Sequence, residues 1–334
     1  MGNQLVPENQ AMQAPIFVLG ISQRSGTNYL FNLIKQHPSC SAPAAIWEDY
    51  LVCHSDLLMT YVDRLVGRWN WKSGSPGNNF GPDMANFIGD GLLKFLSRDA
   101  ESTRFVTKTP DVTNVENFFK LFPQAYLIIL VRDGRAVAES RVKSFHESYD
   151  LAIRKWSVAA KTIMSFQQKM QQSSHKFLLV RYEDLWHDVE KELRRIFYFC
   201  GLDTESYDYM LALNQPIKGS SEYRGEGHTE VHWTPIAKPA DFNPMDRWKH
   251  WDRGRHALFN HLAGEYLEGF GYEKKTYDTH TALWSILVRA LIAKSAANYV
   301  MQRSLKLAKG SIKGFLGEKR RSQIRSRLAK KQLR

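Results

Sequence analysis

Apolar and β-branched residues gather along the chain in short runs, and longer stretches of mixed polarity separate these runs. The runs have the length of buried strands, and they are Ile16–Leu19, Phe105–Thr107, Tyr126–Val131 and Phe177–Val180. The stretches between and after them favour helices, at about 28–36, 111–120, 134–146, 151–172 and 187–200. Strands that alternate with helices predict an α/β fold of three layers, with a mostly parallel central sheet flanked by helices.

Three parts of the chain depart from this alternation. The stretch 66–90 is rich in Gly, Asn and Trp, so we expect an insertion over the sheet there, and 213–256 reads as irregular and aromatic. From Leu283 onward apolar residues recur at nearly helical spacing, which predicts one face of an amphipathic helix. Because the composition shifts past Tyr272, we expect a domain at 13–275 and a basic helical extension at 276–334.

The net charge of +12 is concentrated at the C-terminal end. Residues 281–334 contain fourteen Lys or Arg and one acid, Glu318, so the rest of the chain is close to neutral. Two interpretations stay open: a packed helix with a solvated basic tail, and binding of residues 282–334 to an anionic membrane surface. Nucleic acid is not favoured as a partner, because no recognised nucleic-acid-binding fold accompanies the charge.

Cysteine usage and the N-terminal segment bear on location. The three cysteines, Cys40, Cys53 and Cys200, are odd in number and imply no disulfide framework, which suits a reducing compartment. The first fourteen residues are polar and resemble no signal or membrane-spanning segment. We therefore expect a cytoplasmic protein, peripheral at the inner face of a membrane if the basic extension binds lipid.

The segment from Pro15 to Tyr29 predicts an anion cradle. It reads as a strand, a glycine-punctuated turn and a helix that opens at Thr27, so backbone N–H groups and the positive end of the helix dipole converge on one spot. The Walker A loop does not fit, because five residues separate Gly20 from Gly26 and Thr27 stands where that motif has lysine. The cation comes from Arg24 instead.

Cationic residues also follow the other predicted strands. Lys108, Arg132 and Arg181 each come directly after a strand, where open α/β sheets bind their ligands. Several cations at such strand ends are costly to bury unless an anion pairs with them. The pattern therefore predicts an anionic ligand.

Four segments in this order resemble the sulfotransferases that use 3′-phosphoadenylyl sulfate, PAPS. Gln23–Thr27 resembles their 5′-phosphosulfate loop, and Val131-Arg132-Asp133 with Ser140 on the next helix resembles their 3′-phosphate site. Arg181–Leu185 resembles a structural segment, and Ile217–Ser221 resembles the late loop that closes over the nucleotide. Over residues 15–221 the chain is identified as a member of this family, in pattern closest to its carbohydrate, tyrosylprotein and bacterial types.

The resemblance implies a P-loop-like fold, PAPS as the co-substrate, adenosine 3′,5′-bisphosphate (PAP) as the product, and no metal. It implies two sets of donor-binding residues. The 5′-phosphosulfate set is Arg24, Ser25, Gly26, Thr27 and Asn28, and the 3′-phosphate set is Arg132, Ser140, Lys218, Gly219 and Ser220.

The reaction would move a sulfuryl group to a hydroxyl or amine of an unidentified small-molecule, glycan or lipid acceptor. By the resemblance, Arg24 holds the 5′-phosphosulfate with the loop amides and Thr27, and Glu48 is the general base. Lys108 either helps to neutralise the leaving group or positions the nucleotide. Asp49 and His54 are alternative bases, with Asp111 a fourth candidate. Four tryptophans are candidates for the acceptor pocket or for ordinary packing, namely Trp47, Trp69, Trp71 and Trp233.

Two other functions compete with this one. A P-loop kinase or NTPase shares the architecture, although the missing Walker lysine argues against it. A non-catalytic adaptor that binds a membrane surface through the basic extension is the other alternative. A truncation at about residue 276 separates an adaptor from an enzyme that the tail only localises.

Overall fold

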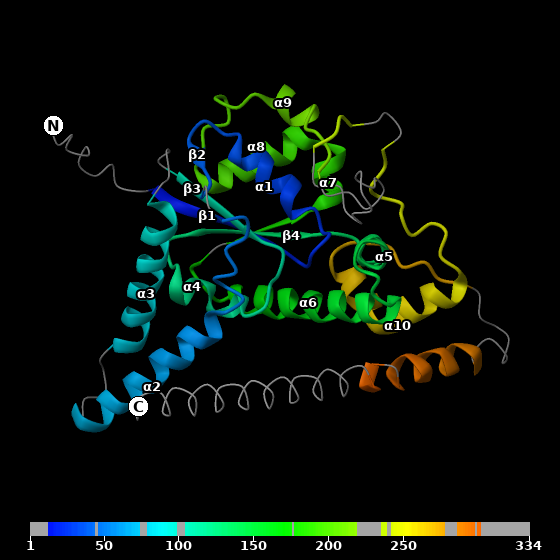
Figure 1. Ribbon diagram of the computed structural model, residues 1–334, viewed down its shortest axis with the longest axis horizontal. Helices are drawn as coiled ribbons and strands as arrows, with labels where there is room; N and C mark the ends of the chain where they lie inside the picture. The colour runs from blue at the N-terminus through cyan, green and yellow to red at the C-terminus, as the bar shows by residue number, and fades with distance from the viewer. Residues whose placement is uncertain are drawn as a thin grey trace, which may run out of the picture. The chain divides into compact units, whose positions relative to one another are not determined.

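The protein is described here by a computed structural model that covers residues 13–43, 46–73, 79–98, 104–175, 177–218, 235–238, 242–277, 286–297 and 299–301. Its centre is a parallel five-stranded sheet in the order β2-β3-β1-β4-β5 (Figure 1). The strands are β1 (Gln13–Gly20), β2 (Cys40–Ser41), β3 (Arg104–Thr109), β4 (Tyr126–Val131) and β5 (Phe177–Arg181). The predicted α/β fold with a parallel sheet is confirmed.

The central strand β1 is apolar without alternation because helices cover both of its faces. Val18 lies in the core cluster on one face, where it meets Leu30 and Ile34 of α1 (Thr27–Lys35). Phe17 points the other way and stacks on Phe122, with ring centroids 4.8 Å apart. Burial on both sides holds the carboxyl end of β1, and the loop that follows it, in a fixed place.

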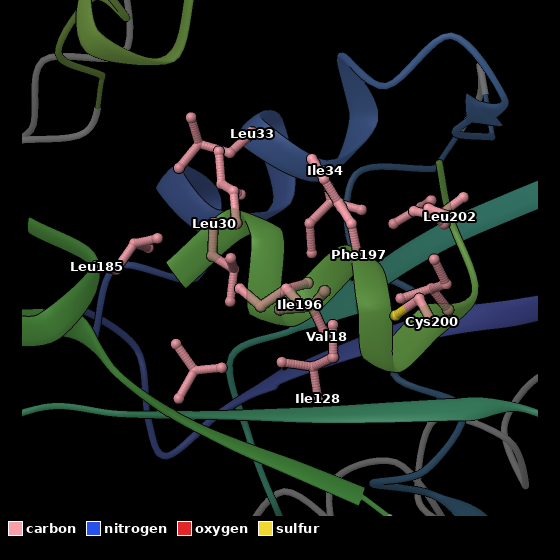
Figure 2. Close-up of a cluster of buried hydrophobic side chains, with 14 of the residues drawn as sticks. Val18, Leu30, Leu33, Ile34, Ile128, Leu185, Ile196, Phe197, Cys200 and Leu202 are labelled. Carbon is pink, nitrogen blue, oxygen red and sulfur yellow. The ribbon is translucent and has the colours of Figure 1, made fainter. Parts of the chain in front are cut away.

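Helices form a layer on each face of this sheet. On one side lie α1, α7 (Tyr182–His187), α8 (Val189–Cys200) and α9 (Tyr209–Leu213), and on the other lie α4 (Phe118–Leu121) and α6 (Tyr149–Met170) (Figure 1). Figure 2 shows Ile196 and Phe197 of α8 packed between α1 and the strand residues Val18 and Ile128. The helix α5 (Gly134–Phe145) follows β4 directly and brings its first turns to the strand ends.

The stretch 66–90, expected as an insertion over the sheet, is largely helical where the structure describes it. The helices α2 (Ser55–Ser73) and α3 (Phe80–Ser97) occupy most of it. Gly89, which lowers helix propensity, is required by packing, since a Cβ there would lie 1.8 Å from the carbonyl oxygen of Leu121. In contrast, the helix expected over 111–120 is shorter than predicted, a 3-10 turn (Val115–Asn117) followed by α4.

The chain divides into two compact units. One comprises Met1–Trp251 and Leu262–Lys274, and the other comprises Asp252–His261 and Lys275–Arg334. Helix α10 (Arg253–Gly269) contributes to both, and 286–297 is helical in the second. Among the described residues no helix is long and apolar enough to cross a membrane. Most of the basic residues of the extension lie outside the described residues.

Candidate active site

A cavity of about 650 Å³ lies at the carboxyl ends of the strands. Its lining falls into two chemical groups. The first is cationic or hydroxyl-bearing: Arg24, Thr27, Arg132, Ser140, Lys218, Lys238 and Arg247. The second is aromatic: Tyr29, Trp47, Phe145, Tyr182, Trp186 and Phe242. One carboxylate, that of Glu48, joins them. The cavity thus combines anion-binding groups with flat apolar faces.

The loop between β1 and α1 is held in an unusual backbone conformation. Arg24 has φ 77° and Gly26 has φ 96°, both in the left-handed region. At Gly26 a Cβ would also lie 2.4 Å from the Tyr182 ring. Both the positive φ and this close approach therefore require glycine at this position. No side chain caps the start of α1, and the first N–H groups of a helix have no partner within it. The loop therefore offers backbone donors to an anion.

Arginines from three segments meet around one hydroxyl. Ser140 Oγ accepts from Arg24 Nε at 3.1 Å and from Arg247 Nη1 at 3.3 Å. Arg132 Nη1 donates to the Arg24 carbonyl oxygen at 3.0 Å, and its other terminal nitrogen donates to the Pro244 carbonyl oxygen. Among the described residues the buried Arg132 Nε has no hydrogen-bond partner.

This cluster carries an electrostatic signature of an anion site. Burial, together with the nearby charges of Arg247 and Arg132, lowers the pKa of Arg24 to about 9. Like charges that crowd together while buried destabilise the ligand-free state. A bound polyanion would offset the repulsion between these arginines and would accept a hydrogen bond from Arg132 Nε.

At the other end of the cavity two lysines flank one tryptophan. The Nζ atoms of Lys218 and Lys108 lie 4.2 Å and 5.0 Å from ring centroids of Trp47. Lys108 is almost fully buried and donates from Nζ to Glu48 Oε1 at 3.0 Å. Burial lowers the pKa of Lys108, while the Glu48 charge acts in the opposite direction.

The candidate bases differ in position. Glu48 lines the cavity, whereas Asp49 lies half-buried beside β3, where it accepts from Thr107 Oγ1 at 2.8 Å and from Leu51 N at 2.8 Å. Burial raises the pKa of the Asp49 carboxyl. In the described part of the chain, His54 and Asp111 are also absent from the lining. The geometry favours Glu48.

Most of the predicted site residues meet at this cavity. Those that line it are Glu48, Arg24, Gly26, Thr27, Asn28, Arg132, Ser140 and Lys218. Lys108 reaches the site through Glu48, and Ser25 is buried, with its hydroxyl 3.2 Å from Thr27 Oγ1. Gly219 and Ser220 lie outside the described residues.

The four candidate tryptophans differ in whether they line the cavity. Trp47 lines the cavity, and Trp69 packs against Phe80 with ring centroids 5.9 Å apart. Trp233 and the side chain of Trp71 lie outside what the structure describes. Sequence reasoning missed Arg247, which follows no predicted strand. The one sequence feature that could have pointed to Arg247 is its position next to Trp248 and Lys249 in the aromatic stretch 213–256.

The model of the sulfotransferase family matches residues 15–206 of this sequence. The chain belongs to the sulfotransferase family. The predicted family and enzyme class are therefore confirmed, as is the transfer of a sulfuryl group from PAPS that membership implies. Sulfotransferases in general act on small-molecule or glycan acceptors. The kinase and adaptor alternatives receive no support from this match.

Two curated relatives of this sulfotransferase are protein-tyrosine sulfotransferases. Protein-tyrosine sulfotransferase 2 of Gallus gallus is 21% identical over 272 residues, which are 78% of this chain and 67% of the relative. Protein-tyrosine sulfotransferase 1 of Danio rerio is 23% identical over 246 residues, 70% of this chain and 65% of the relative. The chain thus spans about two thirds of the length of the relatives it matches.

Solved structures with a similar backbone are also sulfotransferases. The sulfotransferase domain from the curacin biosynthetic pathway has 19% sequence identity and a TM-score of 0.48, over 79% of this chain and 99% of that domain. A mouse sulfotransferase, SULT7A1, complexed with PAP has 14% identity and a TM-score of 0.41, over 86% of this chain and 90% of that chain.

Proposed function

We propose that this sulfotransferase binds PAPS in the cavity at the strand ends and transfers the sulfuryl group to a hydroxyl or amine beside Glu48. One arginine cluster carries the proposal: Arg24 and Arg247 donate to the Ser140 hydroxyl, and Arg132 donates to the Arg24 carbonyl oxygen. A donor with phosphates at two positions needs two cationic subsites joined in one cavity, and the arginines supply them. The roles of individual residues below belong to the proposal.

The two ends of the donor would be held by different elements. The 5′-phosphosulfate would lie at the loop, against Arg24, Thr27, Asn28 and the first amides of α1. The 3′-phosphate would lie between Arg132 and Ser140, with Arg247 as an added cation. The aromatic faces of the cavity, among them Tyr182, Trp186 and Phe242, suit stacking with a purine.

Lys218 is better assigned to the sulfuryl end than to the 3′-phosphate. Its amine lies over Trp47, the ring that also contacts Lys108, and Lys108 is paired with Glu48. Two ammonium groups around this ring would stabilise the negative charge that grows on the leaving phosphate oxygen. Gly219 and Ser220 keep their expected role at the nucleotide as part of the proposal.

The transfer itself would be an in-line displacement. Glu48 would take the proton of the acceptor hydroxyl as its oxygen bonds to sulfur. The bond from sulfur to the bridging oxygen would break, and its electron pair would stay on the 5′-phosphate of PAP. By analogy with phosphoryl transfer, catalysis then consists mainly of positioning and electrostatic stabilisation.

The acceptor would lie along the aromatic part of the cavity, near Trp47. Flat rings favour a phenol, a sugar face or an apolar chain. A phenolic acceptor is an attractive first test, since the curated relatives are protein-tyrosine sulfotransferases. A glycan and a lipid with a free hydroxyl are the other acceptors to compare.

Calorimetry with PAP, 5′-AMP and magnesium-ATP tests the donor site. We expect PAP to bind in the micromolar range without metal, and 5′-AMP to bind at least about tenfold more weakly, because it lacks the group for Arg132. A preference for magnesium-ATP would overturn the proposal. Radiolabelled PAPS with a tyrosine peptide, a sugar and a glycolipid would then identify the acceptor class.

The domain would comprise residues 13–275, and residues 276–334 would form a localising segment. Its many Lys and Arg and the exposed apolar side chains of Ile286 and Leu287 fit the surface of an anionic membrane. In that case the enzyme would act as a peripheral protein at the cytoplasmic face.

A further inference from the structure

The segment that carries Glu48 is joined to the end of β3 by a set of polar contacts. Asp49 N donates to the Lys108 carbonyl oxygen at 3.2 Å, and Tyr50 N donates to Thr109 Oγ1 at 3.0 Å. The Asp49 carboxylate accepts from Thr107 Oγ1 on the same strand. Three consecutive strand residues thus fix this corner, so Glu48 projects from a rigid support.

Two donors reach the Glu48 carboxylate from different sides. Lys108 Nζ donates to Oε1, and the Tyr50 hydroxyl donates to Oε2. The side chain of Glu48 is 19% exposed, while that of Lys108 is 2% exposed. Both oxygens therefore have a donor, although the carboxylate still faces the cavity.

Tyr50 holds its place in a strained backbone. Its φ of 51° lies in the left-handed region, which bulky side chains rarely adopt. Such strain persists only where surrounding contacts fix it, and it concentrates at functional sites. Here the contacts at Asp49 and Thr109 fix it, and the result is that the Tyr50 hydroxyl turns back onto Glu48.

We propose that Tyr50 is a positioning residue that holds the Glu48 carboxylate in the orientation in which it accepts the acceptor's proton. The inference rests on the proposed role of Glu48 as the base. The Tyr50 hydroxyl fixes Oε2, and Lys108 fixes Oε1. The pKa of Tyr50 is raised to about 12, first by its hydrogen bond to Glu48, so its hydroxyl stays a donor at neutral pH.

Other charged groups face this pair from neighbouring elements. Lys108 comes from β3, Lys218 from the segment after α9, and Asp111 from the segment after β3. They remain in place when the Tyr50 hydroxyl is removed, so a change in a Tyr50→Phe variant reports the loss of that hydroxyl.

The first experiment needs no acceptor. Difference infrared spectra of the native chain minus Glu48→Gln isolate the stretching band of the Glu48 carboxylate at neutral pH. In Tyr50→Phe we expect the frequency of this band to change, because one carboxylate oxygen loses its hydrogen-bond donor. The matched control is Tyr198→Phe, because Tyr198 is 86% exposed on α8. We expect it to leave the band unchanged.

The second experiment measures turnover of PAPS with a tyrosine peptide and with 4-nitrophenol. We expect Tyr50→Phe to lower kcat about tenfold, while the KM for the acceptor and the affinity for PAP stay within about twofold of native. Incorporation of 3-fluorotyrosine at position 50, a stronger donor, should shift the band frequency in the opposite direction and retain most of kcat. This variant keeps the ring, so it also serves if Tyr50→Phe unfolds.

The outcomes separate the two proposals. An unchanged band and a native kcat in both position-50 variants would overturn the role of Tyr50 alone, provided that Glu48→Gln is inactive and still binds PAP. An active Glu48→Gln would remove Glu48 as the base, and the role of Tyr50 with it. Failure of the native chain to bind PAP would reject the donor site itself.

Discussion

Arg24 and Ser140 are 116 residues apart in the sequence, yet Arg24 Nε donates a hydrogen bond to Ser140 Oγ over 3.1 Å. The bond joins the loop after β1 to helix α5 after β4, the two neighbouring strands at the centre of the sheet. The loop and helix expected to hold different phosphates of the donor are therefore in direct contact, and Arg132 reinforces it through the Arg24 carbonyl. A change at one subsite should thus be felt at the other.

Replacement of Arg132 should remove selectivity for a 3′-phosphate. In Arg132→Ala we expect PAP to bind roughly 10- to 100-fold more weakly, since one or two charge-assisted hydrogen bonds are lost, while 5′-AMP changes much less. Arg132→Lys keeps the charge without the planar fork and should be intermediate. Calorimetry with both nucleotides measures the ratio.

The control for this variant is Arg195→Ala. Arg195 is a more exposed arginine on α8 that pairs with Glu192 at 2.6 Å, so its removal should leave both affinities unchanged. Equal weakening of PAP and 5′-AMP in Arg132→Ala would contradict the assignment, because it would place Arg132 in a structural role. Arg247→Ala should weaken PAP in the same selective way, since Arg247 shares the Ser140 hydroxyl.

Gly26 should tolerate no side chain. An alanine there meets the Tyr182 ring 2.4 Å away and must keep φ near 96°, so we expect Gly26→Ala to lose about 1–3 kcal/mol of stability and most PAP affinity. Gly91→Ala on α3 is the matched control, because nothing lies within 4 Å of its added Cβ. We expect that variant to gain about 0.5–1 kcal/mol. Chemical unfolding of the two variants measures both changes, and a Gly26→Ala chain as stable as native would contradict this account.

The parts of the site that sequence reasoning found are local in the chain. A strand, its loop and the next helix are contiguous, so Arg24, Gly26 and Arg132 were recognisable from their place after a strand and from the family resemblance of their segments. Glu48 and Asp49 were not separable in that way, since adjacent residues differ only in which way the backbone turns. In the structure, Glu48 lines the cavity, whereas Asp49 turns to Thr107 just before the left-handed corner at Tyr50.

The features that sequence reasoning missed depend on contacts between segments that are distant in the sequence. Arg247 reaches Ser140 across 107 residues, and no local pattern marks such a pair. The helix α3 was missed because its glycines lower helix propensity, yet Gly89 is what allows it to approach Leu121. Tertiary packing decided both.

Asp49 should make stability depend on pH in an unusual direction. Its folded-state pKa is raised by burial, so the folded chain holds the proton more tightly than the unfolded chain does. Stability associated with this group is present at low pH and is lost as pH rises towards the folded-state pKa. In Asp49→Asn the site stays neutral, and the amide retains an oxygen for Leu51 N.

We therefore expect Asp49→Asn to be more stable than the native chain at pH 7, with a difference that shrinks as pH falls into the ordinary range for aspartate. Urea unfolding at several pH values measures the difference. A gap that widens on acidification would contradict the burial of a neutral Asp49. Asp150→Asn on α6 is the control, because Asp150 pairs with Arg154 at 3.1 Å, and this variant should be no more stable than the native chain at pH 7.

The basic extension should direct the enzyme to anionic membranes without affecting donor binding. Replacement of Lys319, Arg320 and Arg321 by glutamine removes three positive charges, each worth about 1 kcal/mol near an anionic surface, so binding to phosphatidylserine vesicles should fall at least tenfold. A matched variant replaces Lys94, Lys161 and Lys169 in the first unit, with the same change in net charge and no expected effect on vesicle binding. Co-sedimentation measures the partition, and calorimetry with PAP should give native affinity in both variants. Equal loss of vesicle binding in the two variants would mean that the net charge of the protein, and not the extension, governs the attraction. No loss in either variant would favour the alternative of a packed helix with a solvated basic tail.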